Sequence, residues 1–114
     1  MEIVESDFVQ MVAKVNQSLT GYDNSDRLDS VRGAISSYYY YDEDRMQIVS
    51  IVRSLIKNHY FVDGNKRTAA TVLFALSSVS GIPMTKNDDY YIDVICDIAS
   101  NHYSVDKVAE ILFE

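Results

Sequence analysis

Residues 65–80 read NKRTAATVLFALSSVS, and this stretch decides the fold. It carries no charge after Arg67, is rich in alanine, and is apolar nearly all round over 68–76. Such a pattern predicts a central, buried helix rather than a surface one. Gly81 and Pro83 follow directly and are typical of a helix end. We therefore expect an all-α domain built around a hydrophobic helix from about Asn65 to Ser80.

Upstream of this stretch, apolar residues recur at helical spacing. The first expected helix, which Gly21 ends, has the inward face Phe8, Met11, Val12, Val15 and Leu19. A second long helix over 43–58 has the inward face Ile48, Ile51, Val52, Leu55 and Ile56. Between them, residues 22–30 are polar and turn-prone, and 31–37 suit a short helix. The tyrosine run 38–41 has no second strand-like run to pair with, so we expect a surface flap or a helix end.

Two further helices are predicted downstream. Asn87, Asp88 or Asp89 can cap the fifth helix, and Ser104 can cap the sixth. The inward residues of the fifth are Ile92, Ile95, Cys96 and Ala99, and those of the sixth are Val105, Val108, Ala109 and Leu112. With short connections and no repeat or linker, the chain is expected to form one domain of five or six helices over 1–114.

Length and composition exclude several classes of protein. The chain has 114 residues, of which 47% are apolar and 24% charged, as in an ordinary globular domain. One cysteine rules out a disulfide scaffold and a cysteine zinc cluster. Because no apolar run is long enough for a membrane span and the acidic N-terminus is unlike a signal peptide, a cytoplasmic location is expected.

The net charge of −7 disfavours general binding to nucleic acid or to anionic lipid. A helix-turn-helix DNA-binding domain, although common among small α proteins, therefore fits poorly. The charge is uneven: residues 1–50 and 86–114 each sum to −5, whereas 51–85 sum to +3. The basic middle section holds Arg53, Lys57, Lys66 and Arg67. This contrast suggests a local anion site, although an uneven scatter of charges is an alternative.

The stretch 59–67, HYFVDGNKR, joins chemistry-bearing residues to the start of the buried helix. Free N–H groups at a helix N-terminus bind anions, and Gly64 lets a phosphate approach the backbone. Lys66 and Arg67 supply donors for phosphate oxygens. Asp63 is a hard ligand suited to Mg²⁺, and His59 can accept a hydroxyl proton. Together these residues suit phosphoryl or nucleotidyl transfer.

Each of these residues also has an ordinary structural interpretation. His59 alone is more often a helix-end histidine, and 63–65 alone is usually a cap and turn. A solvated first turn is the usual interpretation of Lys66 and Arg67, but cations at a helix N-terminus oppose its dipole. Phe61 is expected in the core under any interpretation. Cys96 is expected to be inert core, and His102 has no matching metal ligands.

The same stretch resembles the signature of the Fic/Doc superfamily, whose members are compact helical domains of about this size. The matching positions are His59, Phe61, Asp63, Gly64, Asn65, Lys66 and Arg67. The Fic branch, which mostly transfers AMP to hydroxyl side chains, has glycine where this chain has Lys66 and a second arginine where it has Ala70. Lys66 and the following Thr68-Ala69 resemble the Doc (death-on-curing) branch, although the Doc toxin itself has alanine at the position of Gly64.

The Doc-like resemblance implies a protein kinase toxin that uses ATP and Mg²⁺. His59 would be the base on the target hydroxyl, Asp63 would hold Mg²⁺, and Phe61 would anchor the loop. Gly64 and Asn65 would shape the anion hole, with Lys66 and Arg67 on the phosphates. AMP transfer and a non-catalytic binding module are the alternatives.

The resemblance also implies partners. Elongation factor Tu is the implied target, with growth arrest as the outcome. A target-docking flap is expected within about 20–45, where the tyrosines contact a partner or pack on the domain itself. Family members are commonly restrained by a helix with the pattern Ser/Thr-x-x-x-Glu-Gly/Asn, which this sequence lacks. A separate antitoxin is therefore expected.

Overall fold

The computed structural model describes residues 1–114 as an all-α globule without strands. Its long helices are α1 (Glu5–Thr20), α3 (Asp44–Lys57), α4 (Asn65–Val79), α5 (Asp88–Ser100) and α6 (Val105–Phe113). The short helix α2 (Leu28–Val31) lies among three 3₁₀ turns, η1 (Ser25–Arg27), η2 (Arg32–Ile35) and η3 (Tyr38–Tyr40). The predicted fold class is thus confirmed, and no helix is long and apolar enough to cross a membrane.

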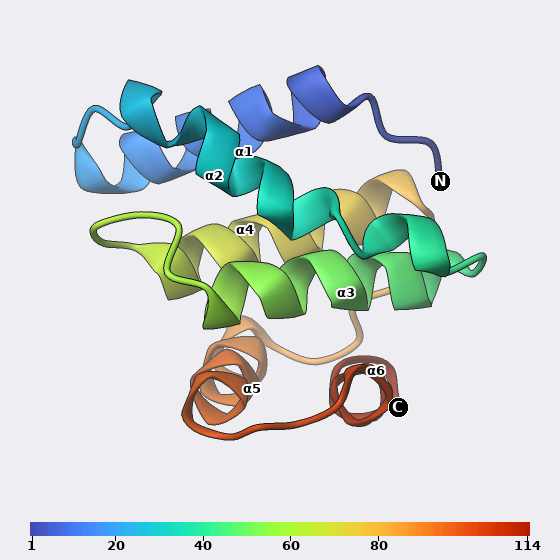
Figure 1. The fold of residues 1–114 in the computed structure, drawn as a ribbon. Coiled ribbons are helices and arrows are strands. Elements are labelled where there is room, and N and C mark those ends of the chain that lie inside the picture. The colour runs from blue at the N-terminus through green and yellow to red at the C-terminus, as the bar shows by residue number, and fades with distance from the viewer.

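The helices form three layers, with α1 and α2 on one side, α3 and α4 in the middle, and α5 and α6 on the other side (Figure 1). Helices α3 and α4 pack against each other as a hairpin, and residues 58–64 connect them. Helix α1 covers α4 on one side, whereas α5 covers α4 and α6 covers α3 on the other. The connection 58–64 therefore lies at one end of the middle layer, as Figure 1 shows.

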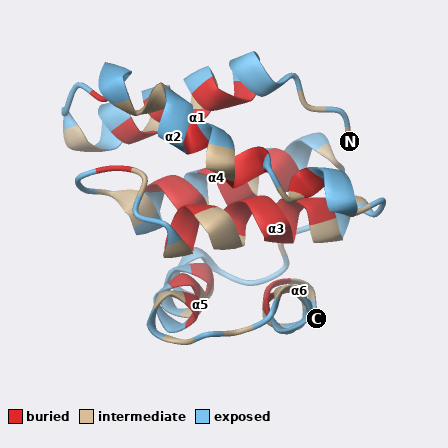
Figure 2. Cartoon of the chain, in the orientation of Figure 1, coloured by how far each residue is buried: buried red, intermediate tan, exposed pale blue.

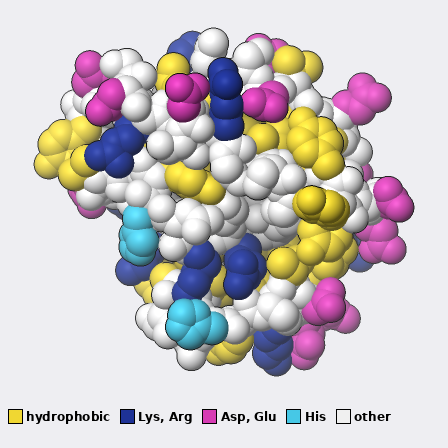
Figure 3. All heavy atoms as spheres, in the orientation of Figure 1, with side chains coloured by type: hydrophobic (Ala, Val, Ile, Leu, Met, Phe, Trp, Pro, Cys, Tyr) yellow, Lys and Arg dark blue, Asp and Glu magenta, His cyan; other side chains and the backbone are white.

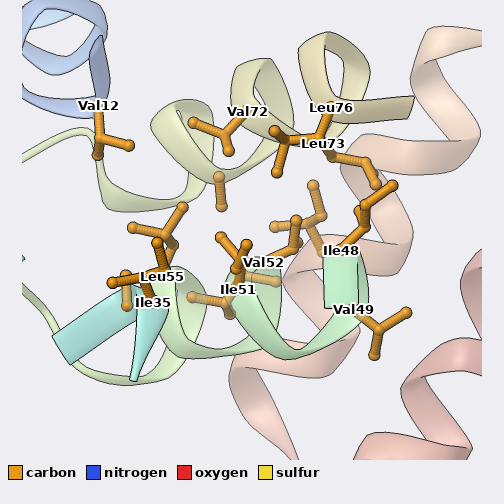
Figure 4. Packing of buried hydrophobic residues seen from close by; sticks show 14 of the residues in the cluster. Val12, Ile35, Ile48, Val49, Ile51, Val52, Leu55, Val72, Leu73 and Leu76 are labelled. Carbon is orange, nitrogen blue, oxygen red and sulfur yellow. The ribbon is translucent and has the colours of Figure 1, made fainter. Parts of the chain in front are cut away.

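One hydrophobic core runs through the three layers, and the buried residues lie on the faces that the layers turn toward each other (Figure 2). In the middle layer, Ile48, Ile51, Val52 and Leu55 of α3 face Val72, Leu73 and Leu76 of α4 (Figure 4). The predicted inward face of α3 is confirmed in full. Helix α4 is central as expected, but it shares the centre with α3, which carries more buried residues.

The predicted inward faces of α1 and α5 are partly wrong. In α1, Val9, Ala13 and Asn16 are buried, whereas Leu19 is 37% exposed. In α5, the buried residues are Tyr91, Ile95 and Ile98, whereas Ile92 is 52% exposed and Cys96 is also exposed. The ring of Tyr91 packs edge-to-face on Phe74 of α4 at 5.6 Å and takes the core position that the pattern assigned to Ile92.

The tyrosine run is neither a flap nor the end of a longer helix, and residues 41–43 separate it from α3. It forms the 3₁₀ turn η3 ahead of α3, with Tyr38 buried and Tyr39 and Tyr40 exposed. Because α3 has 14 residues, about 20 Å of helix separates this turn from the connection 58–64. The exposed tyrosines therefore lie far from the candidate site.

Two of the four cations in the basic middle section hold helices together. The ammonium group of Lys57 donates to three carbonyls at the end of α5, those of Ile98, Ala99 and Asn101, at 3.4, 3.2 and 2.7 Å. Arg53 Nε donates to the Tyr103 carbonyl at 2.9 Å. A cation at a helix C-terminus also interacts favourably with the negative end of the helix dipole. These contacts attach the outer layer to α3.

We predict that Lys57→Ala lowers the free energy of unfolding by about 2 kcal/mol, because three carbonyl groups lose a charged donor. Lys107→Ala is the matched control, since Lys107 makes only an exposed ion pair with Glu110 at 3.5 Å. Such a pair contributes about 0.5 kcal/mol or less. Urea denaturation of both variants measures the difference, and equal losses would contradict this role of Lys57.

Candidate active site

The connection between α3 and α4 is held in shape by the side chain of Asn65. Its Oδ1 accepts the Phe61 N–H at 3.0 Å, and its Nδ2 donates to the Phe61 carbonyl at 2.8 Å. Phe61 itself is buried in the core, as predicted. Asn65 therefore shapes the loop through its side chain, which leaves only its backbone N–H to face a ligand.

Gly64 is the residue at which the chain turns into α4. Its φ of 73° lies in the left-handed region, which favours glycine. A Cβ at this position would lie 2.6 Å from Cγ2 of Thr20, in the last turn of α1. The glycine is thus required both by its backbone conformation and by the close approach of α1. The only non-glycine residue with positive φ, His59 at 47°, lies in the same connection.

The N-terminus of α4 is built differently from that of the other α-helices. Its N-cap Gly64 provides no side-chain acceptor, and α4 is the only α-helix without an acid in its first turn. The first helical bond runs from the Thr68 N–H to the Gly64 carbonyl at 2.8 Å. The amides of Asn65, Lys66 and Arg67 precede it and have no helical acceptor. Two cationic side chains beside free N–H groups make an anion site.

A hollow of about 360 Å³ lies at this helix end. It brings together the predicted site residues other than Phe61, which anchors the loop in the core. Its lining consists of Ile56, His59, Val62, Asp63, Gly64, Asn65, Lys66 and Arg67. His59 is exposed, and Asp63 Oδ2 lies 3.8 Å from Arg67 Nη2. A base, a carboxylate and an anion-binding helix end thus share one hollow.

Acids and bases are unevenly spread over the surface. On the face in Figure 3, acidic side chains lie along one edge and, together with some Lys and Arg side chains, over the outer layer of α1 and α2, whereas the middle carries Lys and Arg side chains and histidines without acids. The site hollow itself contains two cations and one carboxylate. Its local balance is therefore positive in a chain whose net charge is −7.

The residues present fit a magnesium ion that is held mainly by a nucleotide. No group of three His, Cys, Asp or Glu side chains is arranged to hold a metal alone. Asp63 is the only carboxylate in the hollow, and its side chain is accessible. Mg²⁺ is commonly bound by one or two carboxylates together with substrate phosphates and water. A single carboxylate beside a phosphate site meets that requirement.

Several residues that the sequence did not single out support the site. Asn16 of α1 is buried and donates through Nδ2 to the Asp63 carbonyl at 2.8 Å and to Thr68 Oγ1 at 3.1 Å. Arg27 Nη1 donates to the Tyr60 carbonyl at 3.2 Å. The Tyr60 hydroxyl lies 2.8 Å from Ser54 Oγ. The only sequence signal was the polarity of Asn16 on an otherwise apolar face.

The expected flap over 20–45 is not one open segment. It is folded into α2 and the three 3₁₀ turns. Gly33 lies against Tyr60, and the first part of the segment lies beside Phe61 and Val62. There, a small hollow of about 90 Å³ is lined by residues of 22–27 together with Asn16, Phe61 and Val62. In this segment the Ser25 backbone N–H, and then its hydroxyl, hold the pKa of Asp23 below its usual value.

An apolar groove of about 440 Å³ adjoins the site. It lies between α1, α4 and α5, and Lys66 and Arg67 line both hollows. Its apolar walls include Leu19, Phe74 and Ile92, two of which are the exposed residues that the helical pattern had assigned to the core. Ala70 faces this groove rather than the site hollow.

We predict that Gly64→Ala destabilises the domain more than Gly21→Ala does. Both glycines are left-handed, with φ of 73° and 77°, so both variants lose about 1–2 kcal/mol through backbone strain. A Cβ at 64 would lie 2.6 Å from the methyl group of Thr20 and 3.3 Å from Asn16 Nδ2, whereas a Cβ at 21 meets nothing within 4 Å. Thermal or urea unfolding of Gly64→Ala with and without Thr20→Ser isolates the methyl contact. Thr20→Ser should remove most of the extra loss of Gly64→Ala over Gly21→Ala; an unchanged loss would contradict the close approach.

The comparison with known families agrees with this geometry. The model of the Fic/DOC family matches residues 10–77, which is more than half of the chain. The match contains α1 from its second turn, the connection 58–64 and most of α4, and thus every residue of the site hollow. No curated protein matches this chain in sequence. Members of the family are generally nucleotidyl- or phosphotransferases. Because the family model covers more than half of the chain, including the whole site hollow, this chain belongs to the Fic/DOC family.

Proposed function

We propose that this protein transfers the γ-phosphate of ATP to a hydroxyl side chain of a protein target. The observation that carries the proposal is the free N-terminus of α4, where Lys66 and Arg67 stand beside backbone N–H groups without acceptors. Phosphate oxygens are the natural acceptors for such a group of donors. ATP with Mg²⁺ is therefore the proposed substrate nucleotide.

The residues of the hollow divide the work of the transfer. His59 accepts the proton of the target hydroxyl as its oxygen bonds to the γ-phosphorus. The bond from that phosphorus to the β–γ bridging oxygen breaks, and ADP leaves. Lys66, Arg67 and the N–H groups of α4 hold the phosphate oxygens in place and balance their charge. Magnesium, held by Asp63, would supply additional charge neutralisation on the phosphates.

Transfer of phosphate rather than of AMP is supported by the absence of a second arginine in the hollow. The resemblance places that arginine of the AMP-transferring branch at Ala70, and Ala70 faces the neighbouring apolar groove. Lys66 occupies the position of the glycine of that branch. AMP transfer remains the alternative reaction, and a binding module without turnover is the alternative class.

The proposed partners follow from the Doc-like resemblance. Elongation factor Tu is the proposed target, and a separate antitoxin is the proposed inhibitor. The segment 22–27, part of the expected flap over 20–45, is proposed to meet the target, because it lies beside the connection 58–64 and contributes the exposed Tyr22. The proposed role in the cell is that of a growth-arresting toxin.

Two labelling experiments distinguish phosphate transfer from AMP transfer. The protein is incubated with elongation factor Tu and with ATP that is labelled at either the α or the γ position. We predict that label reaches the target from the γ position only. Label from the α position alone would contradict phosphate transfer and support AMP transfer. Label from neither position, with growth arrest retained, would support the binding module.

His59→Ala tests the role of the base in the same assay. We predict a loss of about 10²–10⁴-fold in the transfer rate, because proton removal from the hydroxyl is no longer assisted. His102→Ala is the matched control, since His102 is also exposed but lies in the connection between α5 and α6. Growth arrest should follow the transfer rate of both variants; arrest that survives His59→Ala would contradict a catalytic mechanism.

A further inference from the structure

We propose that Asn16 is a positioning residue that holds the Asp63–Gly64 peptide from α1 and thereby directs the Asp63 carboxylate toward a phosphate-bound metal. The proposal rests on the proposed function for the identity of the metal complex. Its structural part, the attachment of the loop to α1, stands on contacts within the chain alone. Asn16 itself lines no part of the main site hollow, so it acts through Asp63 rather than on the substrate.

Asn16 is 1% exposed, and both hydrogens of its amide group are used on the active-site segment. They go to the Asp63 carbonyl at 2.8 Å and to Thr68 Oγ1, in the first turns of α4, at 3.1 Å. A buried amide that lost these acceptors would be left without water or protein partners, which is unfavourable. The two bonds therefore tie the residue before Gly64 and the start of α4 to one side chain of α1.

A second buried asparagine sets the direction of the Asn16 amide. Asn24 Nδ2 donates to Asn16 Oδ1 at 3.2 Å and to the Ala13 carbonyl at 2.9 Å. Because Oδ1 of Asn16 accepts from Asn24, its Nδ2 is the group that faces the loop. Asn24 is itself buried and makes no contact with Asp63 by hydrogen bond. Asn24, which lies in the segment 22–27, thus orients the side chain of Asn16.

The last turn of α1 holds the same peptide from a second point. Thr20 Oγ1 donates to the Asn16 carbonyl at 3.0 Å, and its methyl group lies 2.6 Å from the place that a Cβ of Gly64 would take. Asn16 therefore fixes the carbonyl of Asp63 while Thr20 limits the position of Gly64. By contrast, the Asp63 side chain is 62% exposed and its only partner is Arg67 at 3.8 Å. The direction of the carboxylate thus depends on how its backbone is held.

This arrangement predicts a specific loss in Asn16→Ala. Groups that orient a metal ligand typically contribute about 10–100-fold to metal affinity. We therefore expect the gain in ATP affinity on adding Mg²⁺ to fall about tenfold in Asn16→Ala. ATP affinity in EDTA should change much less, because Lys66, Arg67 and the helix N-terminus remain. A residue needed only for stability would leave the magnesium-dependent gain unchanged.

Calorimetric titration of the full chain with ATP, in Mg²⁺ and in EDTA, measures this gain. Asp63→Asn defines the gain that remains when no carboxylate can bind the metal. Ile48→Val is a control for loss of stability alone, because Ile48 is buried in the core away from the loop. The magnesium-dependent gain of Asn16→Ala should be nearly as small as that of Asp63→Asn. The variant with both substitutions should lose no more of this gain than Asp63→Asn alone. Ile48→Val should keep the gain within about twofold. Asn24→Ala leaves Asn16 in place, and its magnesium-dependent gain in ATP affinity should be about threefold smaller than that of the wild type. This variant replaces Asn16→Ala if Asn16→Ala does not fold.

A magnesium-dependent gain that is intact in folded Asn16→Ala would overturn the proposal, as would additive losses in the double variant. Amide hydrogen exchange provides a readout without any ligand. Exchange at Phe61 and Thr68 should be at least tenfold faster in Asn16→Ala than in Ile48→Val at equal global stability; equal rates would overturn the attachment. If the wild type shows no magnesium-dependent gain while this exchange difference is present, the proposed metal role fails and the attachment of the loop stands.

Discussion

The first turn of α4 contains N–H groups without acceptors next to two cationic side chains, and much of the structure is arranged around that constraint. Lys66 and Arg67 both oppose the dipole of their own helix, which costs stability unless an anion lies between them. Burial of α4 between α1, α3 and α5 keeps the helix in place despite that cost. Fold and site are thus connected at one point, where the buried helix begins.

The loop that precedes α4 needs several supports because its own residues are exposed. Phe61 anchors it in the core, and Asn65 closes it by bonding both main-chain groups of Phe61. The last turn of α1 then limits Gly64 from the other side. These contacts leave the side chains of His59 and Asp63 open to the hollow while the backbone beneath them is fixed. An exposed carboxylate and base can thereby keep a defined separation from the phosphate site.

The basic middle section has a more limited role than its charge suggested. Lys57 and Arg53 bind carbonyls at the ends of the outer helices, so they hold α5 and α6 against α3. Only Lys66 and Arg67 remain for an anion. The local anion site inferred from charge stays a prediction, and half of the cations counted for it are structural.

Sequence reasoning predicted the features that depend on local patterns. The caps Asn87 and Ser104, the ends of α4 and the inward face of α3 follow from spacing and cap chemistry, and all were confirmed. The inward faces of α1 and α5 were less predictable, because an amphipathic pattern fixes the face of a helix only to about one position. Tyr91 entered the core because its ring finds Phe74, which is a non-local contact.

The bonds of Asn16 and Asn24 were out of reach for the same reason. They join residues that are 47 and 52 positions apart, or residues on either side of the turn that follows α1 at Gly21. The presence of a polar residue on an apolar helix face does not indicate which carbonyl group that residue will bind. The motif residues, in contrast, are contiguous, so the sequence alone predicted that they lie together at the start of α4.

The central claim is that the N-terminus of α4 binds phosphate groups through its free amides. Titration of ¹⁵N-labelled protein with Mg²⁺ and ATP, followed by amide NMR spectra, tests it most directly. The account predicts that the amide signals of Asn65, Lys66 and Arg67 shift the most, because these N–H groups gain charged acceptors. Binding that shifts signals elsewhere and leaves these three unchanged would contradict it.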